Sequence, residues 1–149
     1  MIVLILLILP FIGAVLSALA GNKAANKIAL LSTVATLLLT AKTYYEFTTG
    51  TVASLDFSTQ WLQEPNIAFS LSIDGLTMVM LILTNLLVPI IVLSGLGASV
   101  QNSRAFYALI LLMQGALNGV FMASDGFVFY VFWELALIPI YFIALIWGN

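Results

Sequence analysis

The residue of this sequence most able to do chemistry is Glu134, a glutamate inside a long apolar run. It follows residue 126, where the run begins, by eight residues, or about 12 Å along a helix that rises about 1.5 Å per residue. An ionised side chain at this depth of a membrane costs about 2.5–3.5 kcal/mol on insertion scales, so such residues usually face a protein interior and have a function. A carboxyl group whose proton affinity changes with its surroundings can bind and release protons. We therefore predict that Glu134 is buried near the middle of a membrane and acts as a proton relay.

Several neutral polar residues are candidates to assist Glu134. Tyr130 and Tyr141 share its helical face. Four others are interpreted as possible support for the relay or for its hydration: Gln114, Asn118, Thr84 and Asn85. Polar residues in membranes also hold helices together, at about 0.6 kcal/mol each, so a structural role stays open for these four. It stays open for Glu134 too, as a protonated group that is hydrogen-bonded to a neighbouring helix.

Two aspartates and two glycines have structural interpretations. Asp74 and Asp125 each precede a glycine at the start of an apolar run. A carboxylate there can accept hydrogen bonds from the free backbone N–H groups of a helix start, so we predict that both are helix caps. Gly115 and Gly119 are four residues apart, a spacing that lets membrane helices approach closely.

The elements that must position these residues follow from the distribution of charge. The 149 residues are 63% apolar and 7% charged, whereas about a quarter of the residues of a soluble domain are charged. Charged residues divide the chain into five apolar runs, each near the roughly 20 residues that a helix needs to cross a membrane. We predict an all-α integral membrane protein, one domain over 1–149, with spans at about 1–20, 28–47, 75–97, 105–124 and 126–148.

The connections between the runs predict an orientation. Lys23, Lys27 and Arg104 lie in two short connections, whereas the long connection over 48–74 and the turn at Asp125 contain acids and no basic residue. Short basic loops stay in the cytoplasm, which places the N-terminus outside, the C-terminus inside and 48–74 outside. Within that outer loop, residues 66–73 alternate apolar and polar side chains, as an amphipathic strand does.

The composition also excludes several kinds of site. The chain has no Cys and no His, so it offers no thiolate metal site, no iron–sulfur ligands and no His-ligated haem. We predict no metal, no cofactor and no redox centre in this chain. A net charge of −2 with scattered Lys and Arg residues gives no basic surface for nucleic acid.

One stretch resembles a known family. Residues 124–149, SDGFVFYVFWELALIPIYFIALIWGN, contain an aromatic-rich run, Trp133-Glu134, Pro139, Tyr141 and a closing Trp147-Gly148. This pattern closely resembles the fifth span of the M-type (chain 4) membrane subunit of proton-pumping NADH:quinone oxidoreductase, respiratory complex I. Residues 9–16 (LPFIGAVL) resemble the first span of that family, and residues 67–87, which contain Asp74-Gly75-Leu76-Thr77, resemble the start of its third.

The resemblance implies a function and a setting. Glu134 corresponds to the fifth-span glutamate of an antiporter-like proton channel, which pairs with a lysine on a later helix. Family members are much longer, so these residues are expected to be the N-terminal part of a larger subunit. The expected partners are the lipid bilayer and other membrane subunits, especially neighbouring antiporter-like chains, in the cell inner (plasma) membrane. NADH, FMN, iron–sulfur clusters and quinone are expected in partner subunits.

Two alternatives remain open. Multisubunit Na⁺/H⁺ antiporters share the Asp-Gly-Leu stretch, so the chain is alternatively a subunit of such a transporter, without a redox partner. It is otherwise a structural or assembly subunit, in which Glu134 clamps helices together.

Overall fold

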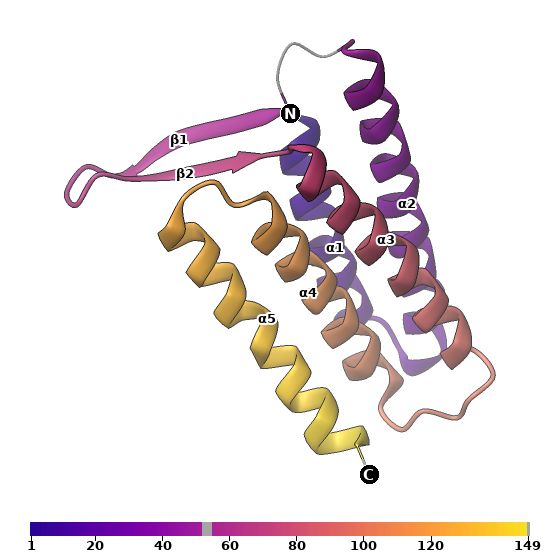
Figure 1. The fold of residues 1–149 in the computed structure, drawn as a ribbon. Helices are drawn as coiled ribbons and strands as arrows, with labels where there is room; N and C mark the ends of the chain where they lie inside the picture. Colours follow the sequence, from indigo (N-terminus) through magenta and orange to yellow (C-terminus); the bar gives the residue numbers. More distant parts are fainter. Residues whose placement is uncertain (52–54, 149) are drawn as a thin grey trace.

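A computed structural model describes residues 1–51 and 55–148 and shows a bundle of five helices with a projecting hairpin (Figure 1). The helices are α1 (Ile2–Leu19), α2 (Asn22–Thr49), α3 (Gly75–Gly95), α4 (Ser103–Met122) and α5 (Gly126–Trp147). The strands β1 (Asp56–Leu62) and β2 (Ile67–Ser72) form the hairpin between α2 and α3. All five helices are long and apolar enough to cross a membrane, which confirms five apolar helices as the core of the fold.

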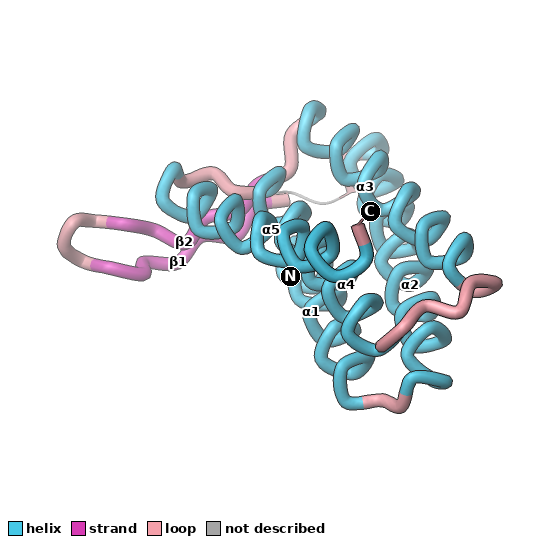
Figure 2. Tube along the Cα trace, turned by 90° about the horizontal axis from the view of Figure 1, so that it is seen from below, coloured by secondary structure: helices cyan, strands magenta, loops and turns pink. Residues whose placement is uncertain are grey.

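Helix α4 occupies the centre of the bundle and contacts α1, α2, α3 and α5. Of the most apolar 18-residue segment of α4, 56% is buried inside the protein, whereas the corresponding share for α5 is 17%. Helix α5 packs on α4 and β2 and forms one side of the bundle (Figures 1 and 2). Most of the surface of α5 is therefore left for lipid or for other protein.

Helix α2 is longer than the apolar run that predicted it. It begins at Asn22, so Lys23 and Lys27 lie in its first two turns and not in a loop. At about 1.5 Å per residue its 28 residues extend about 42 Å, more than the roughly 30 Å of a hydrocarbon core. Hydropathy marks the part of a helix that suits lipid, and α2 continues beyond that part at both ends.

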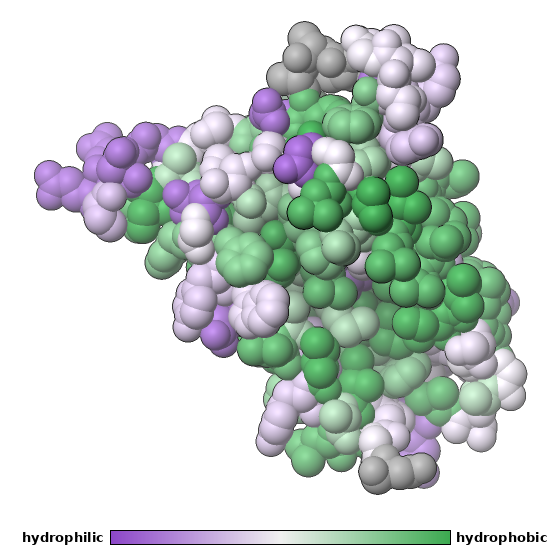
Figure 3. All heavy atoms as spheres, in the orientation of Figure 1, coloured by the Kyte–Doolittle hydropathy of each residue, from purple (hydrophilic) through white to green (hydrophobic). Residues whose placement is uncertain are grey.

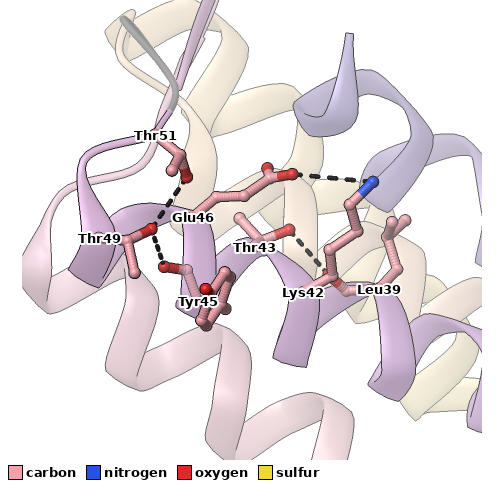
Figure 4. Close-up of polar contacts among 7 residues, drawn as sticks. All are labelled: Leu39, Lys42, Thr43, Tyr45, Glu46, Thr49 and Thr51. Atoms are coloured by element: carbon pink, nitrogen blue, oxygen red, sulfur yellow. Dashed lines mark hydrogen bonds and ion pairs between the residues drawn. The ribbon is translucent and has the colours of Figure 1, made fainter.

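The far end of α2 carries an ion pair. Lys42 Nζ lies 3.7 Å from Glu46 Oε1, one turn along the helix (Figure 4). Thr43 and Thr49 donate to the carbonyl groups of Leu39 and Tyr45, one turn back. These contacts pair several polar side chains of this helix end within the helix itself.

The long connection contains two strands, of which the sequence indicated one. Strand β2 lies within the predicted strand at 66–73, and β1 pairs with it antiparallel, from Asp56 opposite Ser72. The β1 sequence DFSTQWL does not alternate apolar and polar residues, and all its residues except Phe57 are exposed. A strand with no buried face lacks the period-2 pattern by which strands are recognised.

Aromatic rings and a short β-bridge attach this hairpin to the start of α5. Leu71 bridges to Ala123, and Ser124 N donates to Ser70 O at 2.9 Å. The rings of Phe69 and Phe132 lie 6.3 Å apart, edge to face. The hairpin therefore projects from the same end of the bundle as the first turn of α5 (Figure 1).

The outer surface of the bundle suits a membrane. Hydrophobic residues cover the middle of the face in Figure 3, and hydrophilic residues gather at the hairpin tip and near the two ends. Leu31, Leu38, Leu83 and Leu145 are among the large apolar side chains that point outward. The interior of the bundle combines large apolar side chains with small and polar residues, including a row of threonines in α2.

Candidate functional site

Glu134 lies on the outer face of α5. The buried residues of this helix form one stripe, Val128, Phe132, Ala136 and Pro139, which faces the bundle. Glu134 is two residues from Phe132 and from Ala136, so it points about 200° away from each at about 100° per residue. Its side chain is exposed. The described residues therefore do not bury Glu134, because α5 packs against the bundle through the opposite side of the helix.

The two tyrosines share this outer face. Tyr130 is 58% exposed and lies one helical turn before Glu134 on α5. Tyr141 is also exposed, two turns further along α5. In the described part of the chain, the ion pair is the Lys42–Glu46 pair of α2, and no basic side chain pairs with Glu134.

The four neutral polar residues are buried inside the bundle, and Asn85, Gln114 and Asn118 form a polar cluster there. Asn85, Gln114 and Asn118 are fully buried, and Thr84 is 9% exposed. Gln114 Nε2 donates to Asn85 Oδ1 at 2.9 Å, which joins α4 to α3. Asn118 Nδ2 donates to the Leu6 carbonyl oxygen at 3.2 Å, which joins α4 to α1. The expected hydrogen bonds between helices are therefore present in this cluster.

The structure does not bring this cluster to Glu134. Gly119 of α4 packs against the ring of Phe132 in α5, whereas Gln114 and Asn118 face α3 and α1. Glu134 lies beyond, on the far side of α5. Helices α4 and α5 thus separate the two groups of polar residues.

A buried threonine extends the cluster to α2. Asn85 Nδ2 donates to Thr40 Oγ1 at 2.9 Å, and Thr40 Oγ1 donates to Thr36 O at 2.8 Å. Thr40 is not among the residues that the sequence predicts to be functional. The available signal was the spacing of Thr33, Thr36, Thr40 and Thr43, which puts four threonines on one helical face. In a membrane helix, such a stripe indicates the side that faces protein.

Both aspartates cap helices. Asp74 Oδ1 accepts from Thr77 N at 2.7 Å, and Asp125 Oδ1 accepts from Phe127 N at 2.8 Å and from Val128 N at 3.3 Å. The backbone hydrogen bond from Thr77 holds the pKa of Asp74 below its usual value, because it stabilises the charged carboxylate. Both carboxylates thus help to fix the starts of α3 and α5.

The two glycines of α4 mark the closest approaches of its neighbours. A Cβ at Gly115 would lie 2.9 Å from the Phe11 ring of α1, and one at Gly119 would lie 2.5 Å from the Phe132 ring of α5. Each glycine therefore accommodates an aromatic ring from a different helix. Among the described residues, no group of three His, Cys, Asp or Glu side chains could hold a metal ion.

Known proteins are similar in sequence to this chain over almost its whole length. It is 36% identical over 147 residues to F(420)H(2) dehydrogenase subunit M of Methanosarcina mazei, covering 97% of this chain and 30% of that protein. It is 32% identical over 155 residues to NADH-quinone oxidoreductase subunit M of Escherichia coli, with the same two coverages. The chain is a homologue of these M-type subunits. The resemblance seen in the sequence is thereby confirmed, whereas no protein-family model matches the chain.

Solved structures agree with this homology. The chain matches a subunit of respiratory complex I from Thermus thermophilus with a TM-score of 0.81 and 28% identity, over 99% of this chain and 29% of that one. A chain of an archaeal membrane-bound sulfane sulfur reductase shares the fold, with a TM-score of 0.74 and 20% identity, over 94% of this chain and 22% of that one. The present chain thus spans about 30% of the length of the curated M-type subunits reported above.

Proposed function

We propose that this chain forms part of a proton-translocating membrane subunit of an NADH:quinone oxidoreductase, in which Glu134 takes up and releases the proton. One observation carries the proposal: a carboxylate in the middle part of an apolar helix lies on the face of α5 that the other four helices leave uncovered. An acid at this depth facing lipid would be costly. That face is therefore expected to meet protein in the assembled subunit.

The covering protein must also supply what this chain lacks around Glu134. In the described residues, every basic side chain lies near an end of α2 or in the first turn of α4, away from the middle of α5. A relay needs a second station whose charge changes the proton affinity of the glutamate. We place this station in the remainder of a longer subunit or in a neighbouring membrane subunit. The shorter span of this chain relative to its M-type homologues supports that placement.

The proposed mechanism is indirect. Oxidation of NADH and reduction of quinone take place in partner subunits, which hold FMN and the iron–sulfur clusters. Charge rearrangement there changes the environment of Glu134, which binds a proton when its neighbour is neutral and releases it when a cation approaches. Tyr130, one helical turn from Glu134 on the same face of α5, carries a hydroxyl group that can donate a hydrogen bond to an ionised carboxylate.

We further propose that the N-terminus and the hairpin lie outside the cell membrane and the C-terminus inside. The starts of α2 and α4, which carry the basic residues, lie at the same end of the bundle, since Ser103 Oγ donates to Asn22 O at 2.8 Å. Lys23, Lys27 and Arg104 are all within five residues of this contact. The acidic hairpin lies at the other end (Figure 1). The positive-inside rule then assigns the basic end to the cytoplasm of a multi-pass inner-membrane protein.

The test is Glu134→Gln in the full-length subunit within the assembled complex. Glutamine keeps the size of the side chain and cannot ionise, so we expect NADH-driven proton uptake into sealed vesicles, and the coupled NADH:quinone turnover, to be lost. Glu64→Gln is the matched control, because it makes the same change at an exposed position of the hairpin and should leave both activities intact.

The amount of assembled complex is measured on the same membranes. Normal proton uptake and turnover in fully assembled Glu134→Gln complex would refute the proposal. Reduced assembly with unchanged activity per complex would instead assign Glu134 a structural role.

A further inference from the structure

The hydrogen bonds inside the bundle have a fixed direction. The carbonyl oxygen of Thr36 can only accept, so the hydroxyl proton of Thr40 is donated to it, at 2.8 Å. Thr40 Oγ1 must then accept from Asn85, at 2.9 Å, which turns the Asn85 amide nitrogen toward α2. Asn85 Oδ1 consequently faces Gln114 and accepts from its Nε2, at 2.9 Å. The chain of bonds ends at Gln114 Oε1.

Asn118 is oriented by the same kind of constraint. Pro10 has no N–H group, so it cannot donate to the carbonyl of Leu6 one turn earlier in α1. Asn118 Nδ2 donates to that carbonyl instead, at 3.2 Å. The amide nitrogen of Asn118 therefore points at α1, and its Oδ1 is the atom left over.

Two buried acceptors thus remain on neighbouring turns of α4. Gln114 Oε1 and Asn118 Oδ1 have no hydrogen-bond donor among the described residues, and both side chains are 0% exposed. Residues four apart lie next to each other on a helix surface. A buried acceptor without a donor has lost its hydrogen bonds to water and has no protein hydrogen bond in their place, which costs free energy.

The missing donor has to be small and enclosed. Because neither side chain has any exposed surface, a residue from another part of the subunit or from a neighbouring chain has no access to these two oxygens. A metal cation would need about six oxygen ligands or more. The described residues bring no cluster of acids together to supply them. Water needs two to four polar partners and has two hydrogens to donate.

We propose that a water molecule is bound inside the helix bundle and donates one hydrogen to Gln114 Oε1 and the other to Asn118 Oδ1. The site lies between α4 and the pair α1 and α3, and is built by the bonds that orient the two amides. It is distinct from the face of α5 that carries Glu134, so this water belongs to the packing of the bundle. It does not belong to the proposed proton path.

A high-resolution cryo-electron microscopy map of the full-length complex tests the site directly. We expect one density peak at hydrogen-bond distance, about 2.7–3.0 Å, from both oxygens. The peak should be lost in the double variant Gln114→Met, Asn118→Leu, which keeps the side-chain volumes and removes both acceptors. Leu117→Met, a change at a partly buried position of the same helix, should leave the peak in place.

Three results would overturn the inference. One is a wild-type map without the peak, with protein donors on both oxygens. Another is a peak surrounded by five or more oxygens at distances too short for water. The third is retention of the peak in the double variant. The wild-type map decides the question even if the double variant does not assemble, and its outcome is independent of the activity of Glu134→Gln.

Discussion

The close packing of α4 on α5 makes Gly119→Ala an informative substitution. The added methyl group would lie 2.5 Å from two atoms of the Phe132 ring, where ordinary contact begins at 3.4 Å. The ring must therefore retreat by about 0.9 Å. Phe132 is only 8% exposed and packs against the hairpin residue Phe69, so it cannot simply rotate into open space. We expect α5 itself to move outward.

The expected cost follows from two opposing effects. Inserting a methyl group into a packed interface typically costs about 1–3 kcal/mol. Alanine is favoured over glycine inside a helix by about 0.8–1.0 kcal/mol, which offsets part of that cost. A net destabilisation of about 1 kcal/mol remains at the middle of the range. It corresponds to a lowering of the unfolding temperature by about 2–4 °C in a protein of roughly 150–250 residues, and by less in a longer full-length subunit.

Thermal unfolding of the full-length subunit in detergent, followed by intrinsic fluorescence, measures this difference. Gly126→Ala is the matched control, because no atom lies within 4 Å of a Cβ built there. It should unfold at the wild-type temperature or slightly above. Equal unfolding temperatures for Gly119→Ala and Gly126→Ala would refute the claim that Phe132 limits the approach of α5 to α4.

Two further predictions concern the other helices and the orientation. Asn118→Leu should lower the unfolding temperature less in a Pro10→Ala background than in the wild type, because the alanine that replaces Pro10 supplies an N–H group for the Leu6 carbonyl; additive effects would contradict this assignment. Since these 149 residues contain no cysteine, Gln63→Cys in the hairpin turn and Ser99→Cys in the α3–α4 connection each add one thiol to this part of the subunit, and the subunit without either substitution is the labelling control. In whole cells whose outer envelope has been permeabilised, a membrane-impermeant maleimide should label the Gln63→Cys variant and not the Ser99→Cys variant. Labelling of Ser99→Cys alone would show that the orientation is the reverse of the one proposed.

Local patterns predicted the features of this fold that depend on local chemistry. The apolar runs predicted the five helices, and the Asp-Gly pairs at Asp74 and Asp125 predicted both N-caps. The burial of Glu134 stays a prediction, since its depth in a span does not say which side of α5 meets the other described helices. That side is decided by the stripe of Val128, Phe132 and Ala136, which fits α4.

Other features depend on partners that are distant in sequence. Thr40 looks like an ordinary helix residue until Asn85, 45 positions later, donates to it. Strand β1 has almost no buried face of its own and is a strand because β2 pairs with it. The start of α2 at Asn22 lies in a polar stretch that hydropathy assigns to a loop, although α-helical hydrogen bonding does not require apolar residues.

The bond between Asn118 and Leu6 also bears on how the protein is made. Its two residues are 112 positions apart, and Pro10 leaves the Leu6 carbonyl without a donor within α1. If the helices enter the membrane in the order of synthesis, the Leu6 carbonyl has no donor from Asn118 until α4 has been inserted. Accessory factors of membrane insertion that shield polar groups would act during this interval, and a delay between α3 and α4 would prolong it.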